Sequence, residues 1–304
     1  CGRDILADQN FKYNLTVRKT NEAILNSYKG NRDSEDFQNF ITYAKRVFFS
    51  NGIHHHYAED KFVPEISQEY FAELVKNSDV NQLPLSDNET VDEFLTFITP
   101  VIFDKDLYAT RRSGEDDIIK NSATNFYKGD ISKEEVEKFY DAQRVPNDAT
   151  PISYGLNSQL VKENGKIYEN VYKSGGLYGE AIDQIIYWLE KANAVAENDT
   201  QRNYTNLLID YYKTGDLNTW DEYNVAWVQD SVSTIDFVNG FIEDYGDPMG
   251  MKATWEAVVN FKDMEATKRS SLISQNAQWF EDPLVRVCHF SLCDFLHLLT
   301  ERGL

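Results

Sequence analysis

The chain has 304 residues, and its 41% hydrophobic and 13% aromatic content is enough to bury a sizeable core. Its 30 Lys and Arg against 50 Asp and Glu give a formal net charge of −20, which disfavours partners such as nucleic acids and anionic membrane surfaces. The same charge suits cationic ligands, of which the free amino terminus of a peptide is one. The sequence has no apolar run of about 20 residues of the kind that crosses a membrane.

The sequence begins with Cys1 rather than Met. One interpretation is a processed bacterial lipoprotein, periplasmic or membrane-anchored through a lipid on Cys1; the other is the boundary of a fragment, with a cytoplasmic location. No cysteine lies between Cys1 and Cys288, so the body of the chain has no disulfide framework.

Apolar spacing and capping residues predict a series of helices. The first covers residues 35–49, with Ser34 as its N-cap and Gly52 in a left-handed C-cap position. Ser67 caps a second helix, and Thr90 precedes a third that ends at Pro100. Further helices are predicted after the S-x-x-E capping box of Ser132 and Glu135, and over residues 180–196, 203–213 and 251–279.

One segment has the period of strands instead of helices. Two runs, 153–162 and 166–173, flank Asn164–Gly165, and an Asn-Gly pair between such runs is typical of a β-hairpin. We therefore expect an α+β fold, mostly helical with a small antiparallel sheet or barrel.

Three consecutive histidines, His54, His55 and His56, follow the first predicted helix. In an extended segment His54 and His56 point one way and His55 the other. Two ligands on one face do not complete a tetrahedral zinc site, so Glu59 or Asp60 would have to fold back as a third. A structural metal site, a substrate-lining or hydrogen-bonding role and plain loop packing remain as alternatives.

The last segment, residues 283–304, differs in composition from what precedes it, which is also what a truncated or out-of-frame coding sequence would give. It holds four soft potential zinc ligands: Cys288, His289, Cys293 and His297. Their spacing fits no structural zinc pattern, so a hydrophobic helix with incidental Cys and His is favoured over a metal site.

The stretch "NGFIEDYGDPMG", residues 239–250, resembles the G-F-I-E-x-Y-x-D-P-x-G segment of the dipeptidyl peptidase III family of zinc exopeptidases, most closely its Bacteroidetes members. "DKFVP" (60–64) and "GLYGEAIDQIIYWLEKANAVAENDT" (176–200) resemble two further family segments, in the family's order. The resemblance implies two lobes, one with helices and a small β-barrel and one helical and zinc-binding. It assigns 1–250 to the substrate-binding, β-barrel-containing lobe, 251–282 to a helix leading into the zinc lobe, and 283–304 to a divergent tail.

The family binds zinc through a His-Glu-x-x-Gly-His helix and a downstream Glu-Glu-Cys-Arg-Ala-Glu stretch, and neither motif occurs in this sequence. The resemblance implies an intact zinc enzyme that releases dipeptides from peptides with a free N-terminus. For this chain alone we expect no bound zinc and no hydrolysis.

The resemblance also implies candidate substrate-binding residues. Asp236 matches the family's acidic residue that anchors the substrate ammonium, whereas Val238 stands where the family has a supporting Tyr and cannot form that hydrogen bond. Asn239 is an alternative donor. The resemblance places His54 and His56 on the cleft-facing lobe. From its pattern alone, "SYGLNS" is expected to offer a strand edge to an extended peptide at Tyr154, Gly155 and Asn157.

Purely structural explanations are also open for several residues of these segments. Glu243 and Tyr245 stand at a spacing that also fits pairing within or beside a helix, and Trp227 and Trp255 are more typical of core residues than of ligand platforms. A second hypothesis for the whole chain is a lipid-anchored acidic protein that captures cationic peptides without cleaving them. A third is an unrelated metal-binding protein that uses His54–His56.

Overall fold

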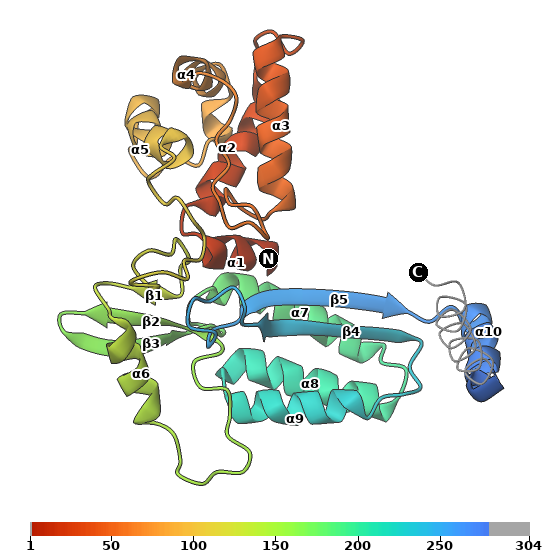
Figure 1. The fold of residues 1–304 in the computed structure, drawn as a ribbon. Coiled ribbons are helices and arrows are strands. Elements are labelled where there is room, and N and C mark those ends of the chain that lie inside the picture. The colour runs from red at the N-terminus through yellow and green to blue at the C-terminus, as the bar shows by residue number, and fades with distance from the viewer. Residues whose placement is uncertain (1, 280–304) are drawn as a thin grey trace, which may run out of the picture. The chain divides into compact units, whose positions relative to one another are not determined.

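The computed structural model describes residues 2–279 (Figure 1). The described chain divides into two compact units: residues 2–233 with 238–258 form the first, and 234–237 with 259–279 form the second. Cys1 and the Cys and His residues of the 283–304 segment lie outside the described residues, and so do the hypotheses about them.

The N-terminal part of the first unit is helical, and most of its buried aromatic and aliphatic side chains belong to one core cluster, from Phe11 to Ile102. Phe11, Phe40 and Phe94 are 1% exposed or less in this cluster. The first two of its helices were not predicted from the sequence. The elements are α1 (Gly2–Asn10), α2 (Asn14–Ser27), α3 (Glu35–Phe49), α4 (Gln68–Lys76), the 3₁₀ turn η1 (Val80–Gln82) and α5 (Val91–Phe103).

The predicted N-caps of these helices are confirmed. The hydroxyl of Ser34 accepts the backbone N–H of Phe37 at the start of α3, and Thr90 forms a full capping box with Glu93 at the start of α5. The hydroxyl of Ser67 accepts the backbone N–H of Tyr70 at the start of α4.

Two predicted helix ends are wrong. Asn51, with φ 52°, adopts the left-handed conformation after α3, and Gly52 instead lets the chain approach Asn14, whose side chain a Cβ would meet at 2.1 Å. Helix α5 continues through Pro100 to Phe103. The ammonium of Lys61 donates to carbonyls at this end of the helix, which stabilises the turn beyond the proline.

A three-stranded sheet follows, in the order β1-β2-β3 (β1 Tyr127–Lys128, β2 Ser158–Glu163, β3 Lys166–Val171). β1 runs parallel to β2, and β2 pairs with β3 in the predicted hairpin. Asn164 and Gly165 have φ of 50° and 77°, as a two-residue hairpin turn requires. Helix α6 (Lys133–Asp141) lies between β1 and β2 in sequence, and its Ser132–Glu135 capping box is confirmed.

The helix predicted over 180–196 is α7 (Gly179–Ala194), and the one predicted over 203–213 is α8 (Asp199–Thr214). A further helix, α9 (Leu217–Val228), was not predicted. Helix α8 packs against both α7 and α9, with Tyr204, Leu208 and Tyr223 buried between them.

The single helix predicted over 251–279 is wrong. This segment contains β5 (Thr254–Phe261) and then α10 (Met264–Gln275), and β5 pairs with β4 (Ile235–Glu243) (Figure 1). β-branched residues at 254, 258 and 259 favour the extended form, and helical structure begins only where Asp263 caps α10. Because β4 ends at Glu243, the helical pairing considered for Glu243 and Tyr245 is wrong as well.

The fold class is confirmed: the chain is mixed α+β, mainly helical with small sheets. None of the helices within residues 2–279 is both long and apolar enough to cross a membrane.

Candidate functional site

The D-P-M-G turn that follows β4 is built around Asp247, which is 2% exposed. Its carboxylate accepts the backbone N–H groups of Met249, Met251 and Lys252 at 2.9–3.2 Å and the hydroxyl of Tyr127 at 2.9 Å. Burial raises the pKa of Asp247, and the three backbone hydrogen bonds lower it. The motif acidic residue therefore fixes the path of the chain from β4 to β5 and ties it to β1.

Lys252, which ends this turn, is completely buried. Its ammonium donates to the Tyr140 hydroxyl at 2.6 Å, to the Ser158 hydroxyl at 3.1 Å and to the Gly155 carbonyl at 3.2 Å. Both hydroxyls in turn donate to Oε1 of Glu169, at 2.9 and 2.6 Å. Burial lowers the pKa of Lys252 to about 8, which the charges of Glu169 and Asp247 partly oppose.

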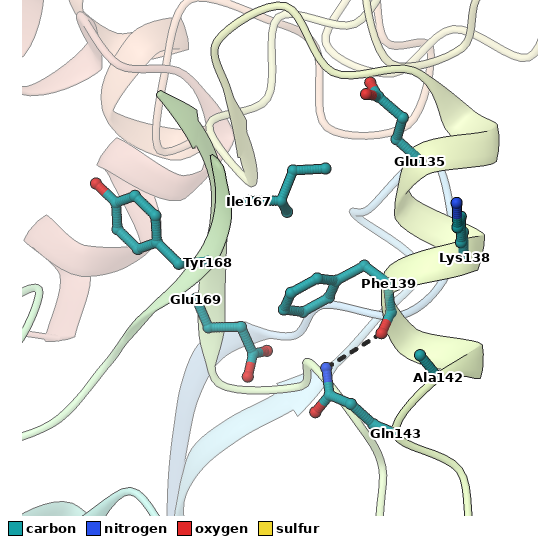
Figure 2. Close-up of a pocket in the computed structure, with 8 residues that line it drawn as sticks. All are labelled: Glu135, Lys138, Phe139, Ala142, Gln143, Ile167, Tyr168 and Glu169. Atoms are coloured by element: carbon teal, nitrogen blue, oxygen red, sulfur yellow. Dashed lines mark hydrogen bonds between the residues drawn. The ribbon is translucent and has the colours of Figure 1, made fainter. Parts of the chain in front are cut away.

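This buried network reaches the surface at a cavity between α6 and β3, shown in Figure 2. The half-buried Glu169 lines the cavity, and the side chains of Phe139 and Ile167 form its apolar walls. Of the network residues, only Gly155 was a predicted site residue, and it was predicted for another role. The one sequence signal was the alternation of Ile167 and Glu169 along a predicted strand, which places both on one face.

Among the predicted binding residues, Asn239 is held in a relay of hydrogen bonds. Its Oδ1 accepts the hydroxyl of Tyr212 at 2.8 Å, and that hydroxyl accepts the indole N–H of Trp255 at 2.9 Å. Gly240 next to it lets β4 approach Trp220, whose ring a Cβ would meet at 2.4 Å. The sequence "NGFIE" thus packs a strand against aromatic side chains, with one amide fixed in orientation.

Asp236 lies in β4, half-buried, within the second unit. Val238 lies in the same strand and is also half-buried. The roles assigned to Asp236 and Asn239 stay predictions.

The three histidines have three different surroundings. His54 is 2% exposed, its Nε2 lies 2.8 Å from the Tyr108 carbonyl, and burial lowers its pKa to about 4. Nδ1 of His55 accepts the backbone N–H groups of Tyr57 and Ala58, so this ring closes a turn. His56 is half-buried, and burial together with the charge of Arg111 lowers its pKa. The enclosure of His54 does not support a substrate-lining role, whereas His56 retains access to solvent.

The segment "DKFVP" and the histidines before it belong to a tightly bonded loop. Arg111, 4% exposed, forms a two-pronged ion pair with Glu59 at 2.8 Å for each bond and donates to the His56 carbonyl at 3.0 Å. The Lys61 ammonium donates to the carbonyls of Val101, Asp104 and Leu107. This family segment is therefore explained by structure: it joins the loop to the end of α5.

The three residues predicted in "SYGLNS" have different surroundings in the structure, and the carbonyl of Gly155 accepts the ammonium of Lys252. Tyr154 lines a cavity of about 470 Å³ that Asp244 and Met251 also line. Asn157 is 3% exposed and donates to the Gly215 carbonyl at 3.0 Å. Residues 154–157 form turns that precede β2, and β2 is the middle strand of its sheet, so its paired length offers no free edge to a peptide.

No group of three His, Cys, Asp or Glu side chains within the described part of the chain is arranged to hold a metal ion. His54 and His56 are not joined by a third ligand, because Glu59 pairs with Arg111 and the Nε2 of His54 contacts a carbonyl. The residues at 54–60 therefore do not fit zinc.

Solved structures of two peptidases share this fold over part of their length. Dipeptidyl peptidase III from Caldithrix abyssi matches 90% of this chain and 40% of its own, with a TM-score of 0.54 and 19% identity. The enzyme from Corallococcus sp. strain EGB matches 92% and 40%, with a TM-score of 0.53 and 15% identity. The fold is therefore that of one portion of a dipeptidyl peptidase III.

The sequence model of Peptidase family M49 matches residues 104–290, and the chain belongs to this family. Curated relatives named dipeptidyl peptidase 3 include those of Dictyostelium discoideum (23% identical; 81% of this chain and 36% of the relative), Rattus norvegicus (24%; 88% and 40%) and Homo sapiens (24%; 88% and 40%). The chain thus spans about two fifths of the length of these relatives. The predicted resemblance is confirmed.

Proposed function

We propose that this chain forms the peptide-binding part of a zinc-dependent dipeptidyl peptidase that removes dipeptides from peptide N-termini. The observation that carries the proposal is the family match over 104–290, which includes β4 with its acidic Asp236. The formal charge of −20 supports it, because it attracts a cationic peptide terminus.

In this proposal the carboxylate of Asp236 accepts a charge-assisted hydrogen bond from the substrate ammonium, worth about 1.5–3 kcal/mol. The anchored terminus sets which peptide bond lies at the reaction centre, two residues along. Asn239 is held by Tyr212 in one orientation, so its amide N–H₂ is available to the substrate backbone. In this proposal the residues of this chain bind and position the peptide, and hydrolysis requires the zinc motifs of the family, which this sequence does not contain.

The test is binding of a fluorescent tetrapeptide to the chain, with free and acetylated N-termini compared. We expect acetylation and Asp236→Asn each to weaken binding by about 10- to 100-fold. Glu222→Gln, which removes a charge from the exposed face of α9, is the matched control and should change nothing. Equal binding of both peptides would overturn the ammonium anchor.

The rival hypothesis is a binding protein that captures peptides without cleavage. A chromogenic dipeptidyl amide, incubated with the chain and with the intact protein in the presence of zinc, distinguishes the two. Cleavage by the intact protein alone supports the peptidase portion. Tight peptide binding without cleavage in either case supports the capture protein.

A further inference from the structure

The cavity between α6 and β3 has a volume of about 690 Å³, enough for a small organic ligand. Figure 2 shows Phe139 of α6 and Ile167 of β3 pointing into the space between the two elements, with Ala142 on the helix wall. Tyr168, the residue between Ile167 and Glu169, points to the other side of the strand. The walls are therefore largely apolar.

The carboxylates of the cavity differ in what they can still bind. Glu135 uses both oxygens on the ammonium of Lys162, at 2.7 and 2.8 Å. Glu169 uses only Oε1, which accepts the hydroxyls of Ser158 and Tyr140. Its Oε2 accepts no hydrogen bond from any described residue, and Figure 2 shows the carboxylate at the base of the cavity.

Glu169 is also held in place from behind. The two hydroxyls that it accepts are themselves bound to the buried ammonium of Lys252, so the carboxylate cannot turn without breaking both bonds. A carboxylate fixed in this way, with one oxygen toward an apolar space, is preorganised for a positive group. Lys138, the cation of the lining, lies on the α6 side of the cavity, across from Glu169 (Figure 2).

We propose that this cavity binds a small organic cation, a primary ammonium or guanidinium on a compact apolar body, with Glu169 as its counter-ion and Phe139 and Ile167 as its apolar walls. The charge of −20 over the whole chain favours the approach of such a ligand. This site is separate from the ammonium anchor proposed at Asp236 and goes beyond the peptidase function.

Calorimetric titration of the chain with 2-phenylethylammonium, and with the neutral isostere 2-phenylethanol, tests the proposal. We expect the alcohol to bind about 10- to 100-fold more weakly than the ammonium. Glu169→Gln should weaken the binding of the ammonium by a similar factor. Glu137→Gln removes an exposed α6 charge that pairs with Lys133 and is the matched control. Equal binding of ammonium and alcohol would overturn the proposal.

A second variant separates loss of the site from loss of the fold. Ala142→Leu adds bulk to the helix wall without touching the Lys252 network, and we expect it to abolish binding of 2-phenylethylammonium. Asp236→Asn should leave this binding unchanged, although we expect it to weaken the binding of the tetrapeptide. Binding that survives Ala142→Leu and Glu169→Gln but is lost in Asp236→Asn would assign the cation to the peptide anchor and overturn the second site.

Discussion

Two buried lysines in the first unit show two ways to bury an ammonium. Lys61, 9% exposed, is surrounded by backbone carbonyls at the end of α5. Lys252, fully buried, is surrounded by two side-chain hydroxyls and one carbonyl, and through the hydroxyls it reaches Glu169. Burial lowers the pKa of both. The first lysine completes a helix end, whereas the second connects a turn of the family motif to a cavity.

The difference lies in what each ammonium organises. Carbonyls at a helix end stay where the helix places them, so Lys61 follows structure that is already formed. The network around Lys252 joins residues of α6, β2 and β3, which meet only in the folded chain. A network of this kind specifies tertiary arrangement, and its loss is costly when its members stay buried without partners.

The largest effect is expected at Asp247, which holds the turn beside Lys252. Asp247→Ala leaves three backbone N–H groups and the Tyr127 hydroxyl without their acceptor, and we expect it to lower the free energy of unfolding by about 3–5 kcal/mol. Asp244→Ala, at an exposed position three residues earlier, is the control. Urea unfolding followed by circular dichroism measures both, and a similar loss in the two variants would contradict this role of Asp247.

Replacing each lysine by Met sharpens the comparison. Lys252→Met should lower the free energy of unfolding by about 2–4 kcal/mol, because the Glu169 carboxylate loses its buried cation. Lys61→Met should cost about 1–2 kcal/mol, since Asp104 and Leu107 are exposed enough for water to reach their carbonyls. The two variants are compared in one urea series. A larger loss for Lys61→Met would reverse the ranking.

The pH dependence of stability should differ between the wild type and Lys252→Met. The pKa of Lys252 is about 8 in the folded chain and 10.5 for an ordinary lysine, so between these values the unfolded chain binds more protons. This lysine therefore makes the wild type more stable as pH rises from 8 to 10, by about 1–3 kcal/mol. Above pH 10 the buried tyrosines, whose pKa values are raised, act in the opposite direction.

Unfolding midpoints measured at pH 7, 8, 9 and 10 test this expectation. The stability of the wild type relative to Lys252→Met should increase across the series. A difference that stays constant would show that Lys252 keeps its proton throughout this range.

The local part of the fold was predictable from the sequence. The caps Ser34, Thr90 and Ser132 act over three residues, and the Asn164–Gly165 turn over two, so a single sequence contains all the information that these elements need. The helix predicted over 251–279 was wrong because β5 is extended through its pairing with β4, and local residue spacing does not reveal such pairing.

The candidate site divides along the same line. The roles of Asp236 and Asn239 stay predictions that rest on their place beside a family motif, and Tyr154 lines a cavity. The contacts of Lys252 with Tyr140 and Ser158 span 112 and 94 positions, and no periodicity connects residues so far apart. The burial of His54 against the ring of Phe11 was not predictable, because Phe11 lies in a part of the chain in which no helix was predicted.

The smallest expected effect on stability comes from the capping boxes of α5, in the region of Lys61, and of α6, in the region of Lys252. Thr90→Ala and Ser132→Ala each remove one cap, from α5 and α6, and should each cost about 1 kcal/mol. Helix α5 has 13 residues with five buried, whereas α6 has nine with two buried, so α6 has less packing to resist fraying. Hydrogen exchange should therefore accelerate more in α6 than in α5. Since α6 forms one wall of the cavity, Ser132→Ala should also weaken the binding of 2-phenylethylammonium, whereas Thr90→Ala should not. Equal effects of the two variants on binding would contradict a link between α6 and the ligand.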